Sequence, residues 1–180
     1  MDMKLATRIN SLLPLFGDDV REVLANLRRI GLTHVDLNYP EHSRDIEAGQ
    51  MRQVLADCRL EANGVALRFR SERYLNGEFG NADPAIATEA LQLCKDACDY
   101  CRAIGGRVVT IWLGFDGFDY PFQIAYARVW EQQRKAFQTI CDYAPDLQVS
   151  IEYKPFEERS HAFIDSFGAV FAMIQDVGRP

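Results

Sequence analysis

An acidic and a basic side chain, Glu152 and Lys154, stand two residues apart in the segment Val-Ser-Ile-Glu-Tyr-Lys-Pro at residues 149–155. Because side chains alternate across a β-strand, both project from one face with Ser150 behind them, and the apolar residues of the run project from the other. An acid and a base at the carboxyl end of a buried strand occupy the place where α/β enzymes carry out their chemistry. The same spacing also fits a strand-end salt bridge, so the surrounding elements must decide between the two interpretations.

The elements that must position this pair alternate strand and helix five times along the chain. Strands are expected at residues 5–10, 34–39, 64–70, 107–113 and 147–154. Each is followed by apolar residues at helical spacing, which predict helices from Asp18 to Gly31, through Ile46 to Cys58, from Asp83 to Gly105, from Tyr126 to Ile140 and from Phe163 to Ile174. Asp83-Pro84 is a favourable helix start, and the glycines mark helix ends.

Each predicted strand has apolar side chains at alternate positions, on one face. The side chains at the positions between them, on the other face, include polar residues. In a doubly wound sheet helices cover both faces, so central strands would be apolar throughout. A barrel with helices outside and an active-site lumen inside explains the polar parity directly. We therefore predict one α/β domain over residues 1–180, the (βα)5 portion of a TIM barrel.

A complete eight-stranded barrel takes about 200 to 250 residues, and the chain has 180. Five strands cannot close, so the first and fifth would keep unpaired hydrogen-bonding edges. The sequence thus predicts a barrel that is incomplete after the fifth unit and truncated before a sixth strand.

Polar side chains of the inward parity meet at the carboxyl ends of the strands, and they comprise Asn38, Arg68, Arg70, Trp112, Glu152 and Lys154. Two long loops join them: residues 71–81, with Gly77 and Gly80, are expected to form a lid, and residues 114–123 are rich in aromatics and acids. Aromatic faces beside polar tips suit a polyhydroxylated substrate, although aromatics also anchor ordinary loops. His42, in the loop after the second strand, is a further candidate for substrate contact.

Composition excludes several classes of protein. The net charge of −6 and the pI near 5.1 argue against a nucleic-acid or anionic-membrane surface. The amino-terminal residues lack the apolar core of a signal peptide and no run is long enough to span a membrane, so we expect a cytoplasmic protein. Cys94, Cys98 and Cys101 fall on one helical stripe without a fourth ligand nearby, which predicts core residues rather than a zinc site.

Two segments carry a resemblance to a known family. Glu152-Tyr153-Lys154-Pro155-Phe156-Glu157 is close to the pattern Glu-x-Lys-Pro-x-Glu, and Ile111-Trp112-Leu113-Gly114 looks like a tryptophan-bearing pocket strand. In these segments and in the order of its elements, the chain resembles the xylose isomerase-like TIM barrels, which include sugar isomerases and ketose 3-epimerases. The resemblance implies that Glu152 is a ligand of Mn²⁺ or Mg²⁺, that Lys154 contacts the metal-bound substrate oxygen, and that Trp112 shields the site.

One departure limits what the resemblance implies. The remaining metal ligands of the family come from its last three strands, so a strand with an inward Asp followed closely by a His is expected after Pro180. One carboxylate cannot hold a catalytic metal, and this chain alone is therefore expected to be inactive.

The leading interpretation is a metal-dependent sugar isomerase represented by its amino-terminal part. Two alternatives stay open: a ketose 3-epimerase of the same fold, which Lys154 disfavours, and a non-catalytic remnant or assembly subunit whose open edges pair with another chain or a second copy. An apurinic-site nuclease of the same fold is disfavoured by the acidic charge and by the presence of only three histidines.

Overall fold

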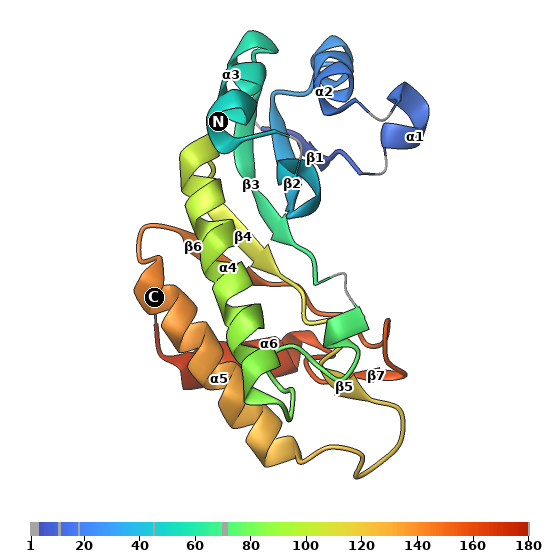
Figure 1. The fold of residues 1–180 in the computed structure, drawn as a ribbon, viewed down its shortest axis with the longest axis vertical. Coiled ribbons are helices and arrows are strands. Elements are labelled where there is room, and N and C mark those ends of the chain that lie inside the picture. Colours follow the sequence, from blue (N-terminus) through green and yellow to red (C-terminus); the bar gives the residue numbers. More distant parts are fainter. Residues whose placement is uncertain (1–3, 11, 18, 45, 70–71, 180) are drawn as a thin grey trace. The chain divides into compact units, whose positions relative to one another are not determined.

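The computed structural model describes residues 4–10, 12–17, 19–44, 46–69 and 72–179 (Figure 1). The strands are β1 (Ala6–Arg8), β2 (His34–Tyr39), β3 (Glu61–Leu67), β4 (Val108–Ile111), β5 (Gly117–Phe118), β6 (Gln148–Ile151) and β7 (His161–Ala162). The α-helices are α1 (Leu13–Phe16), α2 (Val20–Arg29), α3 (Ala48–Asp57), α4 (Pro84–Ile104), α5 (Tyr126–Tyr143) and α6 (Phe167–Val177), and two 3₁₀ turns are η1 (Glu41–Ser43) and η2 (Glu72–Tyr74).

The described strands confirm the predicted α/β class. Five of them form an open sheet in the order β1-β2-β3-β4-β6, and the β1–β2 and β2–β3 pairs run parallel. A short antiparallel pair, β5 with β7, forms a second sheet. The described strands do not close into a barrel, in agreement with the predicted (βα)5 portion.

The start of α4 follows the predicted cap, whereas α3 and α5 begin without a side-chain cap. The Asp19 carboxylate accepts a hydrogen bond from the backbone N–H of Arg21 at the start of α2, whereas the predicted start, Asp18, lies outside the described residues. The Asp83 carboxylate accepts from the backbone N–H of Ala85 at the start of α4. A side-chain acceptor at this position satisfies one of the backbone donors that the first helical turn leaves unpaired.

The predicted boundary of the fifth strand is wrong. β6 ends at Ile151, so Glu152 and Lys154 follow the strand instead of lying in it. The backbone N–H of Glu152 still bonds to the carbonyl of Ile111, but Pro155 has no N–H with which to continue a ladder. Tyr153, predicted on the packed face, is accordingly 44% exposed.

The chain forms two compact units, each described by itself. The first contains Met1–Arg68, Ala97–Thr110 and Asp146–Gln148. Its buried side chains come from α2, α3, β2, β3 and β4 and include Val23, Leu24, Leu27, Val35, Leu37, Met51, Leu55, Val65, Leu67 and Val109. Gly64 in β3 must be glycine, because an added Cβ would lie 2.3 Å from the carbonyl oxygen of Val108. These apolar side chains thus form a core between the strands and helices of the first unit.

The second unit contains Phe69–Asp96, Ile111–Pro145 and Val149–Pro180. Its core includes edge-to-face contacts of Phe79 with Phe69 and Phe137, at ring distances of 6.1 and 5.6 Å. The predicted stripe of α6 is only partly correct, because Val170, Met173 and Val177 are buried while Phe167, Phe171 and Ile174 are exposed.

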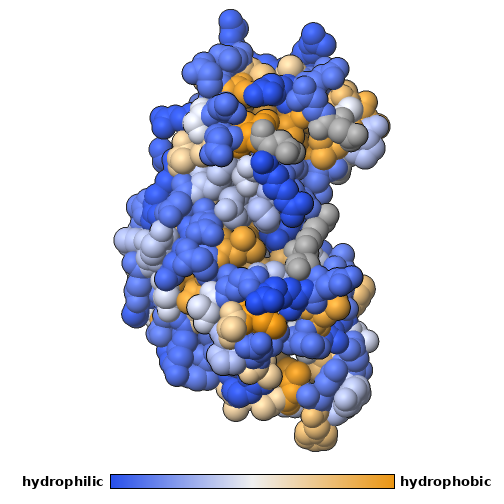
Figure 2. All heavy atoms as spheres, viewed as in Figure 1, coloured by the Kyte–Doolittle hydropathy of each residue, from blue (hydrophilic) through white to orange (hydrophobic). Residues whose placement is uncertain are grey.

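The cysteine prediction is confirmed. Cys94, Cys98 and Cys101 are buried core residues with no solvent exposure. On the face shown in Figure 2, hydrophilic residues predominate and apolar residues form scattered groups. Among the described helices none combines the length and the apolar character that a membrane crossing requires.

Candidate functional site

Lys154 is held between an aromatic ring and a carboxylate. Its ammonium nitrogen lies 3.9 Å from the ring centroid of Trp112 and 2.5 Å from the Oε2 atom of Glu157. The Lys154 side chain is 28% exposed, so solvent screens this ion pair only in part. A cation over the face of an indole is attracted by the ring quadrupole, and the attraction strengthens as water is excluded. The arrangement therefore presents a fixed positive charge next to a flat apolar surface.

Glu152, like Trp112 and Lys154, lies at the carboxyl end of the sheet. It is half-buried, and its backbone N–H donates to the carbonyl oxygen of Ile111, the last residue of β4. Because Trp112 directly follows Ile111, Glu152 and Trp112 both emerge where β4 and β6 end. The structure thus brings together the three candidate residues that come from these strands.

Asn38 lies near the carboxyl end of β2 in the first unit and has no solvent exposure. Its Nδ2 atom donates to the Glu41 carboxylate and its backbone N–H donates to Nδ1 of His42, each at 2.9 Å. The Oδ1 atom is buried and has no hydrogen-bond partner among the described residues. A buried acceptor without a donor costs about 1 to 3 kcal/mol, and the contact of Asn38 with a substrate stays a prediction.

His42 and Arg68 lie in the same unit as Asn38. The His42 ring is buried, and this burial lowers the pKa of the imidazole, so the neutral form holds the Asn38 backbone. Arg68 is half-buried and its backbone N–H donates to the carbonyl of Tyr39. Their contacts with a substrate stay predictions, and Arg70 and Ser71 lie outside the described residues.

Two buried carboxylates lock the long loops of the second unit to each other. Glu78 accepts hydrogen bonds from the backbone N–H groups of Phe115 and Asp116, and Asp116 accepts from those of Glu78 and Gly80, all between 2.7 and 3.2 Å. Gln133 of α5 also donates to Asp116. Asp116 is therefore held as a structural residue, and residues 77–81 are anchored to the 114–123 loop in this structure. The predicted lid at residues 71–81 stays a prediction.

Sequence reasoning missed this carboxylate clamp, formed by Glu78 and Asp116. Its local signal is the pair Gly77 and Gly80, because a Cβ on either glycine would lie 2.6 or 2.8 Å from Oδ1 of Asp116. The two carboxylates stand 38 residues apart in the chain. The two glycines indicate close packing, but nothing in their segment identifies Asp116 as the partner.

The clamp predicts a pH dependence of stability. Burial raises the pKa of Glu78 well above its ordinary value, so the contribution of this group is present at low pH and is lost as pH rises through the folded pKa. We expect Glu78→Gln to gain stability relative to wild type as the pH rises above the ordinary pKa range of a glutamate. Each pKa unit by which the folded protein exceeds the unfolded chain corresponds to about 1.4 kcal/mol in the free energy of unfolding. Urea unfolding of both proteins at a series of pH values measures this difference.

Glu131→Gln is the matched control. The Arg134 hydrogen bond lowers the pKa of this exposed carboxylate to about 2, so Glu131 completes its titration below that pH range. Its stability relative to wild type should stay constant with pH, and a similarly constant value for Glu78→Gln would contradict the prediction.

The four aromatic residues of the 114–123 loop differ in burial, and Phe115 is half-buried. Phe118 stacks on His161 at 5.0 Å and meets Tyr126 edge-to-face at 5.3 Å, so it anchors the loop. Tyr120 and Phe122 are 61% and 89% exposed. Anchoring explains Phe118, whereas the rings of Tyr120 and Phe122 are exposed to solvent.

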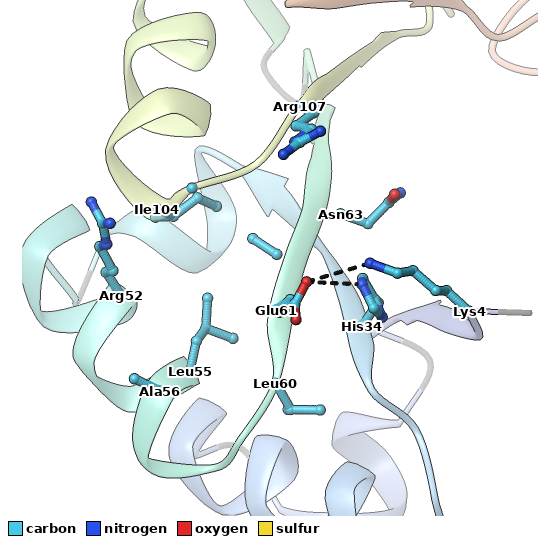
Figure 3. A pocket seen from close by; sticks show the side chains of 12 residues that line it. Lys4, His34, Arg52, Leu55, Ala56, Leu60, Glu61, Asn63, Ile104 and Arg107 are labelled. Atoms are coloured by element: carbon cyan, nitrogen blue, oxygen red, sulfur yellow. Dashed lines mark ion pairs between the residues drawn. The ribbon is translucent and has the colours of Figure 1, made fainter. Parts of the chain in front are cut away.

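A pocket of about 430 Å³ in the first unit lies at the amino ends of the strands (Figure 3). Lys4 and His34 both point toward Glu61, with nitrogen–oxygen distances of 3.7 and 3.2 Å. His34 and Glu61 are the first residues of β2 and β3. Because open and closed parallel sheets place chemistry at the carboxyl ends of strands, this pocket is not the candidate site.

The described residues do not form a metal centre. They contain no group of three or more His, Cys, Asp or Glu side chains arranged to hold an ion. Glu152 could supply one oxygen, but Mg²⁺ requires near-octahedral coordination and Mn²⁺ likewise takes several oxygen or imidazole ligands. The predicted metal therefore does not fit the described residues alone.

Comparison with known proteins decides the family. A model of the xylose isomerase-like TIM barrel matches residues 7–180. The chain belongs to this family. It is 25% identical over 184 residues to a xylose isomerase of Thermus thermophilus, covering 92% of this chain and 48% of that protein. A probable sugar isomerase of Rhizobium meliloti is 22% identical over 111 residues, covering 61% and 26%.

Solved structures share the fold of this xylose isomerase-like chain. A D-allulose 3-epimerase of Methylomonas sp. in complex with D-allulose superposes with a TM-score of 0.77 at 18% identity, covering 99% of this chain and 60% of that one. An L-ribulose 3-epimerase gives a TM-score of 0.74 at 18% identity, with coverage of 98% and 58%. The chain spans about half the length of the xylose isomerase of Thermus thermophilus.

Proposed function

We propose that the protein is a sugar isomerase that interconverts aldoses and ketoses. The observation that carries the proposal is the Lys154 ammonium held 3.9 Å above the Trp112 ring at the carboxyl end of the sheet, next to Glu152. Membership of a family that contains xylose isomerases supports the reaction type.

Each residue has a distinct chemical role in this proposal. The Trp112 ring covers the C–H face of an open-chain sugar and excludes water. Lys154 stabilises the negative charge that develops on the substrate oxygen while the carbonyl moves. Asn38, His42 and Arg68, in the first unit, stay proposed contacts for sugar hydroxyls.

The proposed divalent ion, Mn²⁺ or Mg²⁺, would polarise the carbonyl when bound. Glu152 is the proposed donor from this part of the chain, and the other donors are not among the described residues. One fold neighbour, with a TM-score of 0.73, is described as a protein with a bound zinc atom.

A ketose 3-epimerase is the second candidate, supported by the fold neighbours that are epimerases. In an epimerase, paired carboxylates would transfer protons on the two faces of one carbon, and this mechanism has less need of Lys154. We expect ¹³C NMR of the natively expressed protein with a panel of aldoses and ketoses to show that the carbonyl moves. Inversion of one stereocentre with the carbonyl in place would support the epimerase instead.

A non-catalytic assembly subunit is a candidate of another class. It is supported by the exposed Phe167, Phe171 and Ile174 on α6 and by the open order of the sheet. Light scattering over a range of concentrations tests it, because a monomer at every concentration would count against association through these surfaces.

A further inference from the structure

The turn that follows Lys154 has an unusual backbone. Glu157 and Glu158 both have positive φ angles, 105° and 62°, although neither is glycine. A non-glycine residue in a sparsely populated backbone region is strained and persists only where its surroundings enforce it. Two such residues in succession indicate a turn whose geometry serves a purpose.

Hydrogen bonds on both sides hold this turn, which we define as residues 155–159. The N–H of Glu157 donates to the carbonyl of Arg159, and the N–H of Ala162 donates to the carbonyl of Pro155. The Arg159 guanidinium pairs with Asp119 at 2.8 Å and donates to the carbonyl of Leu75. The turn is therefore fixed from two other segments of the same unit.

The two strained glutamates differ in what their side chains do. The Glu157 carboxylate lies 2.5 Å from the Lys154 ammonium. Glu158 instead packs its Cγ atom beside Gly114, 3.1 Å from the point where a Cβ on that glycine would lie. Its carboxylate makes no ion pair with any residue in the described part of the chain, so the two neighbours provide a matched comparison.

A long lysine side chain has many rotamers, and fixing it in one costs side-chain entropy. Lys154 is restrained by two contacts, the Trp112 ring and the Glu157 carboxylate. The ring attracts the ammonium without fixing its direction closely, whereas the carboxylate on a rigid turn supplies a directed partner. Loss of the carboxylate should therefore release the ammonium from the ring.

We propose that Glu157 is a positioning residue, presented by the strained turn so that its carboxylate holds the Lys154 ammonium over Trp112. Its meaning for catalysis rests on the proposed isomerase function, but the positioning itself does not. Glu157 acts through Lys154 and has no direct role in the reaction.

Tryptophan fluorescence without sugar tests the positioning alone. The chain has two tryptophans, so Trp130→Phe leaves Trp112 as the sole reporter. In that background Lys154→Met defines the emission change caused by removing the ammonium. We expect Glu157→Gln to shift the emission in the same direction and by about the same amount, because glutamine keeps the length but loses the charge. Glu158→Gln should leave the emission unchanged.

A double-mutant comparison separates release of Lys154 from collapse of the turn. If Glu157 acts only through Lys154, adding Glu157→Gln to Lys154→Met should produce no further emission change. A further change in the double variant, an unchanged emission in Glu157→Gln, or an equal effect of Glu158→Gln would each overturn the proposal. Failure of sugar turnover would bear on the proposed function alone, since none of these spectra involves a sugar.

Discussion

Lys154→Met is expected to lower sugar turnover by about 10²-fold or more, the scale of losing one donor that stabilises an oxyanion. Methionine keeps the apolar stem of the side chain and deletes the ammonium that lies over Trp112. The effect should appear in kcat with little change in KM, because the charge on the substrate oxygen develops in the transition state. Steady-state kinetics on the natively expressed protein measure it.

Lys135→Met is the control for loss of one lysine charge. Lys135 is 67% exposed on α5 and pairs with Glu131. Turnover should stay near the wild-type value in this variant. If Lys154 and Glu157 form only a surface ion pair, Lys154→Met would instead cost about 1 kcal/mol of stability or less and leave turnover nearly intact.

Glu152→Gln is expected to lower both divalent-metal affinity and turnover, each by about 10²-fold or more. Glutamine keeps the shape of the side chain but removes the negative charge that a hard cation needs from an oxygen ligand. Metal content after dialysis and kcat, both measured on the natively expressed protein, test the two effects together.

The contrast with Lys154→Met makes this result specific. The lysine variant should keep its metal while losing turnover, whereas the glutamate variant should lose both. Glu61→Gln, at the amino end of β3, should change neither. An active Glu152→Gln protein with normal metal content would remove Glu152 from the proposed metal site.

The sequence predicts most of the elements because their signals are local. β2 has the predicted bounds, and α4 begins at the Asp83-Pro84 cap and ends before Gly105, whose φ is 87°. Apolar periodicity and caps depend on neighbouring residues, so a single segment carries the whole signal.

The parts that the sequence does not predict depend on distant or conformational features. The Glu78–Asp116 clamp joins residues 38 positions apart, and α6 buries Val170 and Met173 instead of Phe171 because of what packs against it. The sequence also does not predict the strained turn, because glutamate seldom adopts a positive φ and the neighbouring residues do not indicate one. The candidate site was therefore predicted by residue type, while its supports were not.

Sugar titration of two single-tryptophan proteins tests the central claim, that sugar binds where Lys154 meets Trp112. Trp130→Phe leaves Trp112 as the reporter, and Trp112→Phe leaves Trp130, which donates a hydrogen bond to Asp176. With an aldose or its ketose partner, we predict a saturable emission change in the protein that retains Trp112 and none in the protein that retains Trp130. No saturable change at Trp112, or equal changes in both proteins, would contradict the account.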